Sequence, residues 1–161
     1  FVKNIQKISK RDLSLVLKIL KYCEKKNLII CIDGSYGTSK MLEYDNLKLM
    51  CIVAEKIKKS PIVIIHSGGL RIKQVLLLAL ENSNIFLDTS FSLPFYVNSS
   101  IENDFAFALK KIGMNRVVYG SDSPYMNPKK TFEVHLDFLE KYKFSYSESE
   151  NFFSKNALKF F

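Results

Sequence analysis

The chain has 161 residues, of which 47% are hydrophobic and 25% are charged, a composition typical of one globular domain rather than of a disordered chain. No apolar run approaches the roughly 20 residues that a membrane-spanning helix needs, and the amino terminus has no signal-peptide pattern, so we expect a cytoplasmic protein without membrane contact. The formal net charge of +8 arises from lysines that occur in twos and threes at predicted helix ends, where cations complement the helix dipole. We therefore expect a solvated surface and no nucleic-acid partner.

Three cysteines, Cys23, Cys31 and Cys51, lie in separate apolar segments, and no Cys-x-x-Cys pair occurs. This odd set predicts reduced thiols in the protein core rather than disulfides or a zinc knuckle.

Short apolar runs alternate with amphipathic stretches along the chain. The short runs are too short for helices and end at polar residues, which is typical of buried strands in a parallel sheet. The predicted strands are residues 28–32, 62–65, 85–87 and 116–119, and helical spacing marks residues 11–26, 47–57, 70–81, 101–112, 132–139 and 152–160. Residues 35–46, 91–100 and 123–128 are predicted loops, and Gly113 is a predicted helix stop. Strands that alternate with helices predict an α/β fold with right-handed crossovers.

Each predicted strand is followed by a residue that can bind a metal ion or move a proton: Asp33, His66, Asp88 and Asp122. Because the carboxyl ends of parallel strands meet at one edge of a sheet, we expect these side chains to face one mouth. Such donors suit a divalent cation of the zinc, manganese or iron class. The alternative for the aspartates is that they begin the loops as turn residues. The second histidine, His135, falls in a helical stripe, and we expect it to pack or to face water rather than to bind metal.

Four segments together resemble the carboxyl-terminal half of the amidohydrolase-related family, whose members are metal-dependent hydrolases and decarboxylases built on a TIM barrel. The segments are PIVIIHSGG at 61–69, NIFLDTS at 84–90, RVVYGSDSP at 116–124 and NALKF at 156–160. The resemblance implies that residues 1–161 form a single domain of parallel β/α units, whose strands correspond to strands five to eight of the (β/α)₈ barrel. A complete barrel takes roughly 250 residues, so we expect its amino-terminal half to be missing from this chain.

The resemblance also assigns roles at the strand ends. It implies that His66 binds the metal or acts on its water, and that Asp122 binds the metal and takes a proton from the water. Neighbouring residues match those that shape this turn in relatives: Gly120, Ser121 and Pro124. At strand five, relatives present a metal-binding histidine where this chain has Asp33, which either ligates the metal or marks a weakened site. The His-x-His pair of strand one has no counterpart here.

The function that the resemblance implies is hydrolysis of a small-molecule substrate. A divalent ion, zinc or manganese, would activate water for attack on a C–N or ester-type carbonyl, and decarboxylation of a small acid is the related reaction. Arg71 and Asp88 are candidate substrate contacts. Arg71 would hold a substrate carboxylate, and the alternative for it is a solvated arginine at a helix start.

Two other interpretations stay open. The chain could be a catalytically inactive family member that serves as a binding or structural subunit, which Asp33 in place of histidine favours. It could also be a small open-sheet α/β binding module, in which case the strand order would be switched. A half barrel leaves sheet edges uncovered, so we expect this segment alone to be poorly soluble or a homo-oligomer, with two copies closing one barrel.

Overall fold

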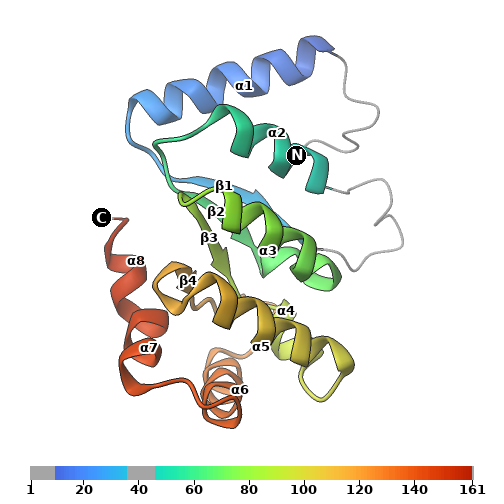
Figure 1. Cartoon of the computed structure of the whole chain (residues 1–161), viewed down its shortest axis with the longest axis vertical. Helices are drawn as coiled ribbons and strands as arrows, with labels where there is room; N and C mark the ends of the chain where they lie inside the picture. Colours follow the sequence, from blue (N-terminus) through green and yellow to red (C-terminus); the bar gives the residue numbers. More distant parts are fainter. Residues whose placement is uncertain (1–9, 36–45, 161) are drawn as a thin grey trace.

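The fold is built on one parallel sheet, shown in Figure 1, and the computed structural model describes residues 10–35 and 46–160. Its four strands lie in the order of the sequence: β1 (Ile30–Asp33), β2 (Ile62–Ile65), β3 (Ile85–Asp88) and β4 (Val117–Val118). The first three strands are paired from their first residues, Ile30 with Ile62 and Ile62 with Ile85. The shorter β4 pairs with the end of β3, Val117 with Leu87. The observed order confirms the predicted β/α architecture and differs from the switched order of an open-sheet module.

Helices precede, connect and follow the strands (Figure 1). They are α1 (Lys10–Lys25), α2 (Leu47–Lys56), α3 (Ile72–Glu81), α4 (Ser92–Tyr96), α5 (Ser100–Ile112), α6 (Pro128–Lys141), α7 (Tyr146–Glu150) and α8 (Asn156–Leu158). Two 3₁₀-helical segments and one π-helical segment accompany them: η1 (His66–Arg71), η2 (Met114–Arg116) and the π-helical η3 (Asn151–Lys155). Helix α2 lies between α1 and the sheet (Figure 1). Within the part of the chain that the structure describes, no helix is long and apolar enough to cross a membrane.

The two faces of the sheet differ in how they are covered. Alternate strand residues form the core with α2, α3 and α5, and all of them are buried: Ile30, Ile32, Ile62, Ile64, Ile85 and Leu87. The residues between them, Cys31, Val63 and Phe86, lie in register across the opposite face. Cys31 is exposed there, and Phe160 packs edge-on against Phe86 with ring centroids 5.0 Å apart. The helix-covered face therefore holds the hydrophobic core, and the other face is partly open.

Several sequence predictions need correction. The cysteines are free thiols, but Cys31 and Cys51 are exposed rather than in the core, because the two-residue period of β1 turns Cys31 away from the helices. The first strand begins at Ile30 rather than residue 28, and the last is shortened to Val117–Val118. The predicted loop 91–100 contains the short helix α4, and the predicted loop 35–46 lies mostly outside the described residues.

Helix boundaries follow local capping chemistry. Ser99 caps α5 by accepting a hydrogen bond from the Ile101 backbone N–H, and Gly113 ends that helix with φ of +84°, as predicted. Asn127 caps α6, with Pro128 in its first turn. The predicted helix 70–81 begins two residues late, at Ile72, because residues of η1 adopt left-handed backbone conformations.

Glu24 at the end of α1 ties this helix to the segment before β2. Its carboxylate accepts hydrogen bonds from the backbone N–H groups of Lys58 and Lys59, at 2.7 and 2.8 Å, and from Lys21 Nζ at 2.9 Å. These donors, the Lys59 amide first, lower the pKa of Glu24 from 4.5 to about 2.

His135 on α6 is fully buried, so of the two environments expected for it, packing or solvent, the structure shows packing. Its Nδ1 lies 2.7 Å from the Thr131 carbonyl oxygen, which can only accept, so Nδ1 carries the proton. Nε2 then accepts from the Thr89 hydroxyl at 2.9 Å. Burial lowers the pKa of His135 from 6.5 to about 4, so the ring is neutral at pH 7.

Glu24 predicts one acid-sensitive contribution to stability. Because its folded pKa is about 2 against 4.5 unfolded, the contribution is complete above pH 4.5 and is lost as the pH falls toward 2. Glu24→Gln should lower the free energy of unfolding by about 1 kcal/mol at pH 7 and flatten the decline below pH 4.5. Thermal unfolding measured against pH tests this, with exposed Glu133→Gln as the control. Equal acid profiles for both variants would contradict it.

His135 predicts a second contribution, in a pH window that lies mostly above that of Glu24. The folded state disfavours protonation of His135, so the stability that its neutral form contributes should fall as the pH drops from 6.5 to about 4, and this contribution should change no further below pH 4. The loss is on the order of 3 kcal/mol at most. His135→Asn should be less stable at pH 7 but should lack this slope. Denaturant unfolding at several pH values measures it, and a wild-type slope that persists in the variant would rule the assignment out.

Candidate functional site

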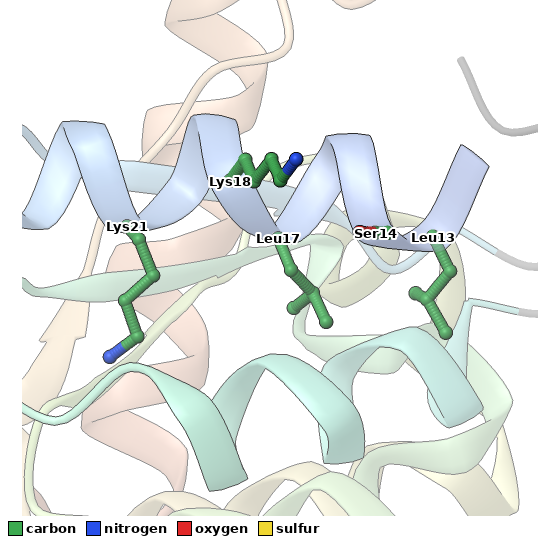
Figure 2. A pocket seen from close by; sticks show the side chains of 5 residues that line it. All are labelled: Leu13, Ser14, Leu17, Lys18 and Lys21. Carbon is green, nitrogen blue, oxygen red and sulfur yellow. The ribbon is translucent and has the colours of Figure 1, made fainter. Parts of the chain in front are cut away.

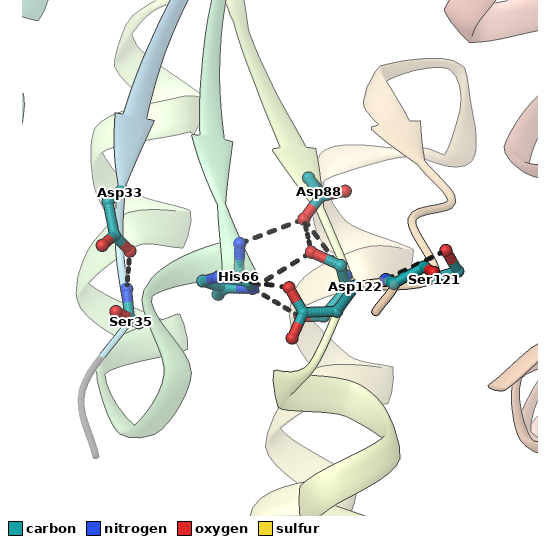
Figure 3. Close-up of polar contacts among 8 residues, drawn as sticks. Asp33, Ser35, His66, Asp88, Ser121 and Asp122 are labelled. Carbon is teal, nitrogen blue, oxygen red and sulfur yellow. Dashed lines mark hydrogen bonds and ion pairs between the residues drawn. The ribbon is translucent and has the colours of Figure 1, made fainter. Parts of the chain in front are cut away.

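Three strand ends bring polar side chains together at one edge of the sheet (Figure 3). His66 follows β2 directly, Asp88 ends β3, and Asp122 lies four residues after β4. His66 Nε2 and Asp122 Oδ1 are 4.0 Å apart, and their side chains are 14% and 22% exposed. This separation is too long for a hydrogen bond, and the partial exposure leaves the pair accessible to a ligand.

The imidazole of His66 is held from its other side by Ser90. Nδ1 lies 2.9 Å from the Ser90 carbonyl oxygen and 3.0 Å from Ser90 Oγ. The Ser90 hydroxyl donates its own proton to Asp88 Oδ1, so it can only accept from the ring. In the neutral ring Nδ1 therefore carries the proton, and the lone pair of Nε2 faces Asp122.

The Asp88 carboxylate is the centre of this network. It is only 7% exposed, and its Oδ1 accepts from the backbone N–H groups of His66 and Ser90, each at 3.1 Å, besides the Ser90 hydroxyl. Burial raises the pKa of Asp88, although these hydrogen bonds act in the opposite direction. The geometry makes Asp88 a positioning residue for His66, and its predicted contact with substrate stays a prediction.

The backbone is strained where the site residues leave the strands. His66, Ser67 and Asp122 have φ values of 63°, 52° and 57°, in the left-handed region that non-glycine residues rarely occupy. Each such residue costs on the order of 1 to 3 kcal/mol, and residues of this kind cluster at functional sites. Gly68 continues the turn at φ of +82°, where a Cβ atom would also meet Val75 Cγ2.

Gly120 allows the segment after β4 to approach Asp88. A Cβ atom at this position would collide with Asp88 Oδ2 and lie 2.8 Å from Ser90 Cβ. The resemblance matched Gly120 as a shaping residue, and this close approach is the physical reason for a glycine here.

Asp33 and Arg71 end two elements, β1 and η1, of which η1 begins at His66. Asp33 Oδ1 accepts from the Ser35 backbone N–H at 2.7 Å, and Figure 3 shows it on its own strand, apart from the contacts of His66. Arg71 borders a small cavity with Gly34 and Asn46. Among the described residues no group of three or more His, Cys, Asp or Glu side chains could hold a metal ion. The roles of Asp33 as a ligand and Arg71 as a substrate contact stay predictions.

Another hollow lies away from the strand ends. Figure 2 shows it along α1, where it is lined by Leu13, Ser14, Leu17, Lys18 and Lys21. These described lining residues include no carboxylate, imidazole or thiol, and so offer no catalytic group comparable to the His66–Asp122 pair.

Sequence reasoning did not assign roles to Ser90 and Thr89, two residues that hold the site. Ser90 orients His66, and Thr89 links the same turn to buried His135. The available signal was the run of hydrogen-bonding residues 88–90 directly behind an apolar strand. Such a run indicates a turn whose side chains can hydrogen-bond to nearby backbone groups, but only the fold shows which groups form those hydrogen bonds.

Comparisons with solved structures show the fold. An uncharacterised TIM-barrel protein from Bordetella bronchiseptica superposes with a TM-score of 0.76 at 17% identity, covering 94% of this chain and 50% of that one. An amidohydrolase from Burkholderia multivorans, at 13% identity, gives TM-scores of 0.71 with bound Hepes and 0.68 with bound zinc. Both of its structures cover 94% of this chain and 60% of their own. The chain therefore has the fold of part of a TIM barrel and spans about half of the first of these proteins.

The match to a protein family covers far more of the chain than any single motif does. No curated protein matches the chain. The profile of the amidohydrolase family, however, matches residues 6–161, which include all four strands and the whole His66–Asp122 site. Because this match extends over nearly the entire sequence, the chain belongs to the amidohydrolase family.

Proposed function

We propose that this chain forms part of a metal-dependent hydrolase that activates water for attack on a C–N or ester-type carbonyl of a small molecule. The observation that carries the proposal is the facing of His66 Nε2 and Asp122 Oδ1, 4.0 Å apart in a partly open site. Membership of the amidohydrolase family supports hydrolytic chemistry. Decarboxylation of a small acid is the related reaction that the same groups could serve.

The donor set fits a divalent ion of the zinc class. Imidazole nitrogen and carboxylate oxygen are both ligands that zinc takes in proteins. Nε2 of His66 and Oδ1 of Asp122 face each other across the partly open site, 4.0 Å apart. His66 and Asp122 would hold the ion, and manganese is compatible with the same donors. When bound, the ion supplies a water molecule whose pKa is lowered toward neutrality.

The residues of this chain prepare the two ligands for that chemistry. Ser90 keeps the proton of His66 on Nδ1, so the lone pair of Nε2 is free to bind a metal ion. Asp122, whose side chain is 22% exposed, has a carboxylate that can take a proton from water at the open side of the site. Asp88 and Gly120 fix the distance between these strand ends.

A second candidate function is that of a catalytically inactive subunit. It is favoured by Asp33, which stands where relatives are expected to present a histidine and whose Oδ1 accepts from the Ser35 amide in its own turn. Zinc bound by a Burkholderia multivorans amidohydrolase of similar fold supports the active alternative. Metal content and turnover separate the two functions.

Replacement of Asp122 tests the proposed function. The full-length protein should bind a stoichiometric divalent metal and hydrolyse simple amides or esters. Asp122→Asn should lower kcat/KM by about a hundredfold or more, because it removes a ligand and a proton acceptor together. Exposed Asp137→Asn on α6 is the matched control. Metal analysis and steady-state kinetics measure the effect, and wild-type protein without metal or turnover would favour the inactive subunit.

Replacement of Ser90 tests the positioning of His66. Ser90→Ala removes one of the two acceptors for Nδ1–H and a donor to Asp88, so zinc affinity should fall by about tenfold. Competition with a chromophoric chelator measures the affinity, and exposed Ser100→Ala serves as the control. In ¹⁵N NMR of the metal-free protein, the share of the Nδ1–H tautomer should also decrease. An unchanged affinity and tautomer ratio would show that Ser90 does not position the ring.

A further inference from the structure

Next to the imidazole of His66 lies a row of two aromatic rings from the segment after β3. Phe91 meets His66 edge-on, with ring centroids 5.8 Å apart and an interplanar angle of 70°. Phe95 stacks on Phe91 at 5.4 Å and 17°. The row therefore leads from the candidate catalytic histidine to Phe95, which is 61% exposed.

The backbone of Phe91 is strained in order to place its ring. This residue has φ of 54° and ψ of −62° immediately before α4. A bulky residue at positive φ is a clear outlier and costs on the order of 1 to 3 kcal/mol. The strain brings the ring against His66 rather than into the hydrophobic core, so it serves the surroundings of the site and not core packing.

Phe95 is exposed although its surroundings hold it in place. The ring lies between Phe91, on which it stacks, and Tyr96, which it meets edge-on at 5.0 Å and 88°. Tyr96 packs in turn on fully buried Phe105, and Leu93 anchors the same helix in the core. A rigid aromatic side chain that keeps much of its surface in water loses little conformational entropy when a ligand covers it.

We propose that Phe91 and Phe95 form a binding site for a planar aromatic group of the substrate, beside the reacting carbonyl. This inference rests on the proposed function and names its substrate class: aryl amides and aryl esters whose ring lies close to the scissile carbonyl. The ring of the substrate packs against the aromatic row while its carbonyl group reaches His66 and Asp122. Saturated substrates of similar size bury comparable apolar surface but lack the favourable ring–ring geometry.

Two measurements on the full-length protein test the site. Binding of benzamide and of cyclohexanecarboxamide is followed by ligand-observed NMR, which needs no turnover. Hydrolysis of methyl benzoate and of methyl cyclohexanecarboxylate gives the ratio of the two kcat/KM values. The variants are Phe95→Leu, which keeps an apolar side chain, and Phe95→Tyr, which keeps the ring. Phe107→Leu on α5, whose side chain is 51% exposed, is the matched control.

Wild-type protein should bind benzamide about five- to tenfold more tightly than cyclohexanecarboxamide, as one well-placed aromatic pair predicts. Phe95→Leu should abolish this preference, whereas Phe95→Tyr and Phe107→Leu should retain it. The kcat/KM ratio of the two esters should change in the same way. Thermal unfolding of Phe95→Leu should stay near that of wild type, because the ring is largely outside the core.

The outcomes separate this inference from the proposed function. Aromatic preference in binding that depends on Phe95, without any hydrolysis, would support the aromatic site and overturn the hydrolase. Hydrolysis with equal use of both esters, unchanged by Phe95→Leu, would support the hydrolase and overturn the aromatic site. An equal loss of benzamide binding in Phe107→Leu would also overturn it.

Discussion

The burial of one carboxylate, that of Asp88, governs the arrangement of the candidate site. A carboxylate that is only 7% exposed must be satisfied by hydrogen bonds, because an unpaired buried charge costs several kcal/mol. The donors that satisfy it are the backbone N–H of His66 and both the backbone and the hydroxyl of Ser90. These hydrogen bonds fix the direction in which each of the three N–H and O–H groups points. The orientation of the imidazole is a consequence of this requirement, since Ser90 can then only accept from its ring.

The strained backbone of the site depends on the rigidity of the sheet beneath it. Left-handed conformations at His66, Ser67 and Asp122 persist only where the surrounding structure determines them more strongly than local preference does. Parallel pairing of β2 with β3 and of β3 with β4 holds these residues in place, because it fixes where each strand ends. The long-range pairing therefore stabilises conformations that the local sequence alone would disfavour, as is common at functional sites.

The sequence predicted the parts of the site that depend on strand position and missed those that depend on side-chain direction. The sequence brings His66 and Asp122 together because each follows an apolar run that forms a strand, and parallel strands end at the same edge of the sheet. Asp33 follows the same pattern, but the nearby amide of Ser35 engages its carboxylate locally. The short α4 could not be predicted because five residues do not establish a helical period. The role of Ser90 depends on a contact between neighbouring strands, and such contacts exist only after the strands have paired.

The close approach at Gly120 has a consequence for how this protein tolerates mutation. Most positions at which a single substitution disables an enzyme either carry the reacting group or lie in the core. Gly120 does neither, yet one added methyl group there would displace Asp88 and separate the strand ends that it joins. The atoms that this methyl group would meet belong to Asp88 and Ser90, whereas the core formed with α2, α3 and α5 contains neither residue. A single substitution at Gly120 could therefore disrupt the hydrogen bonds of the candidate site while most of the fold is retained.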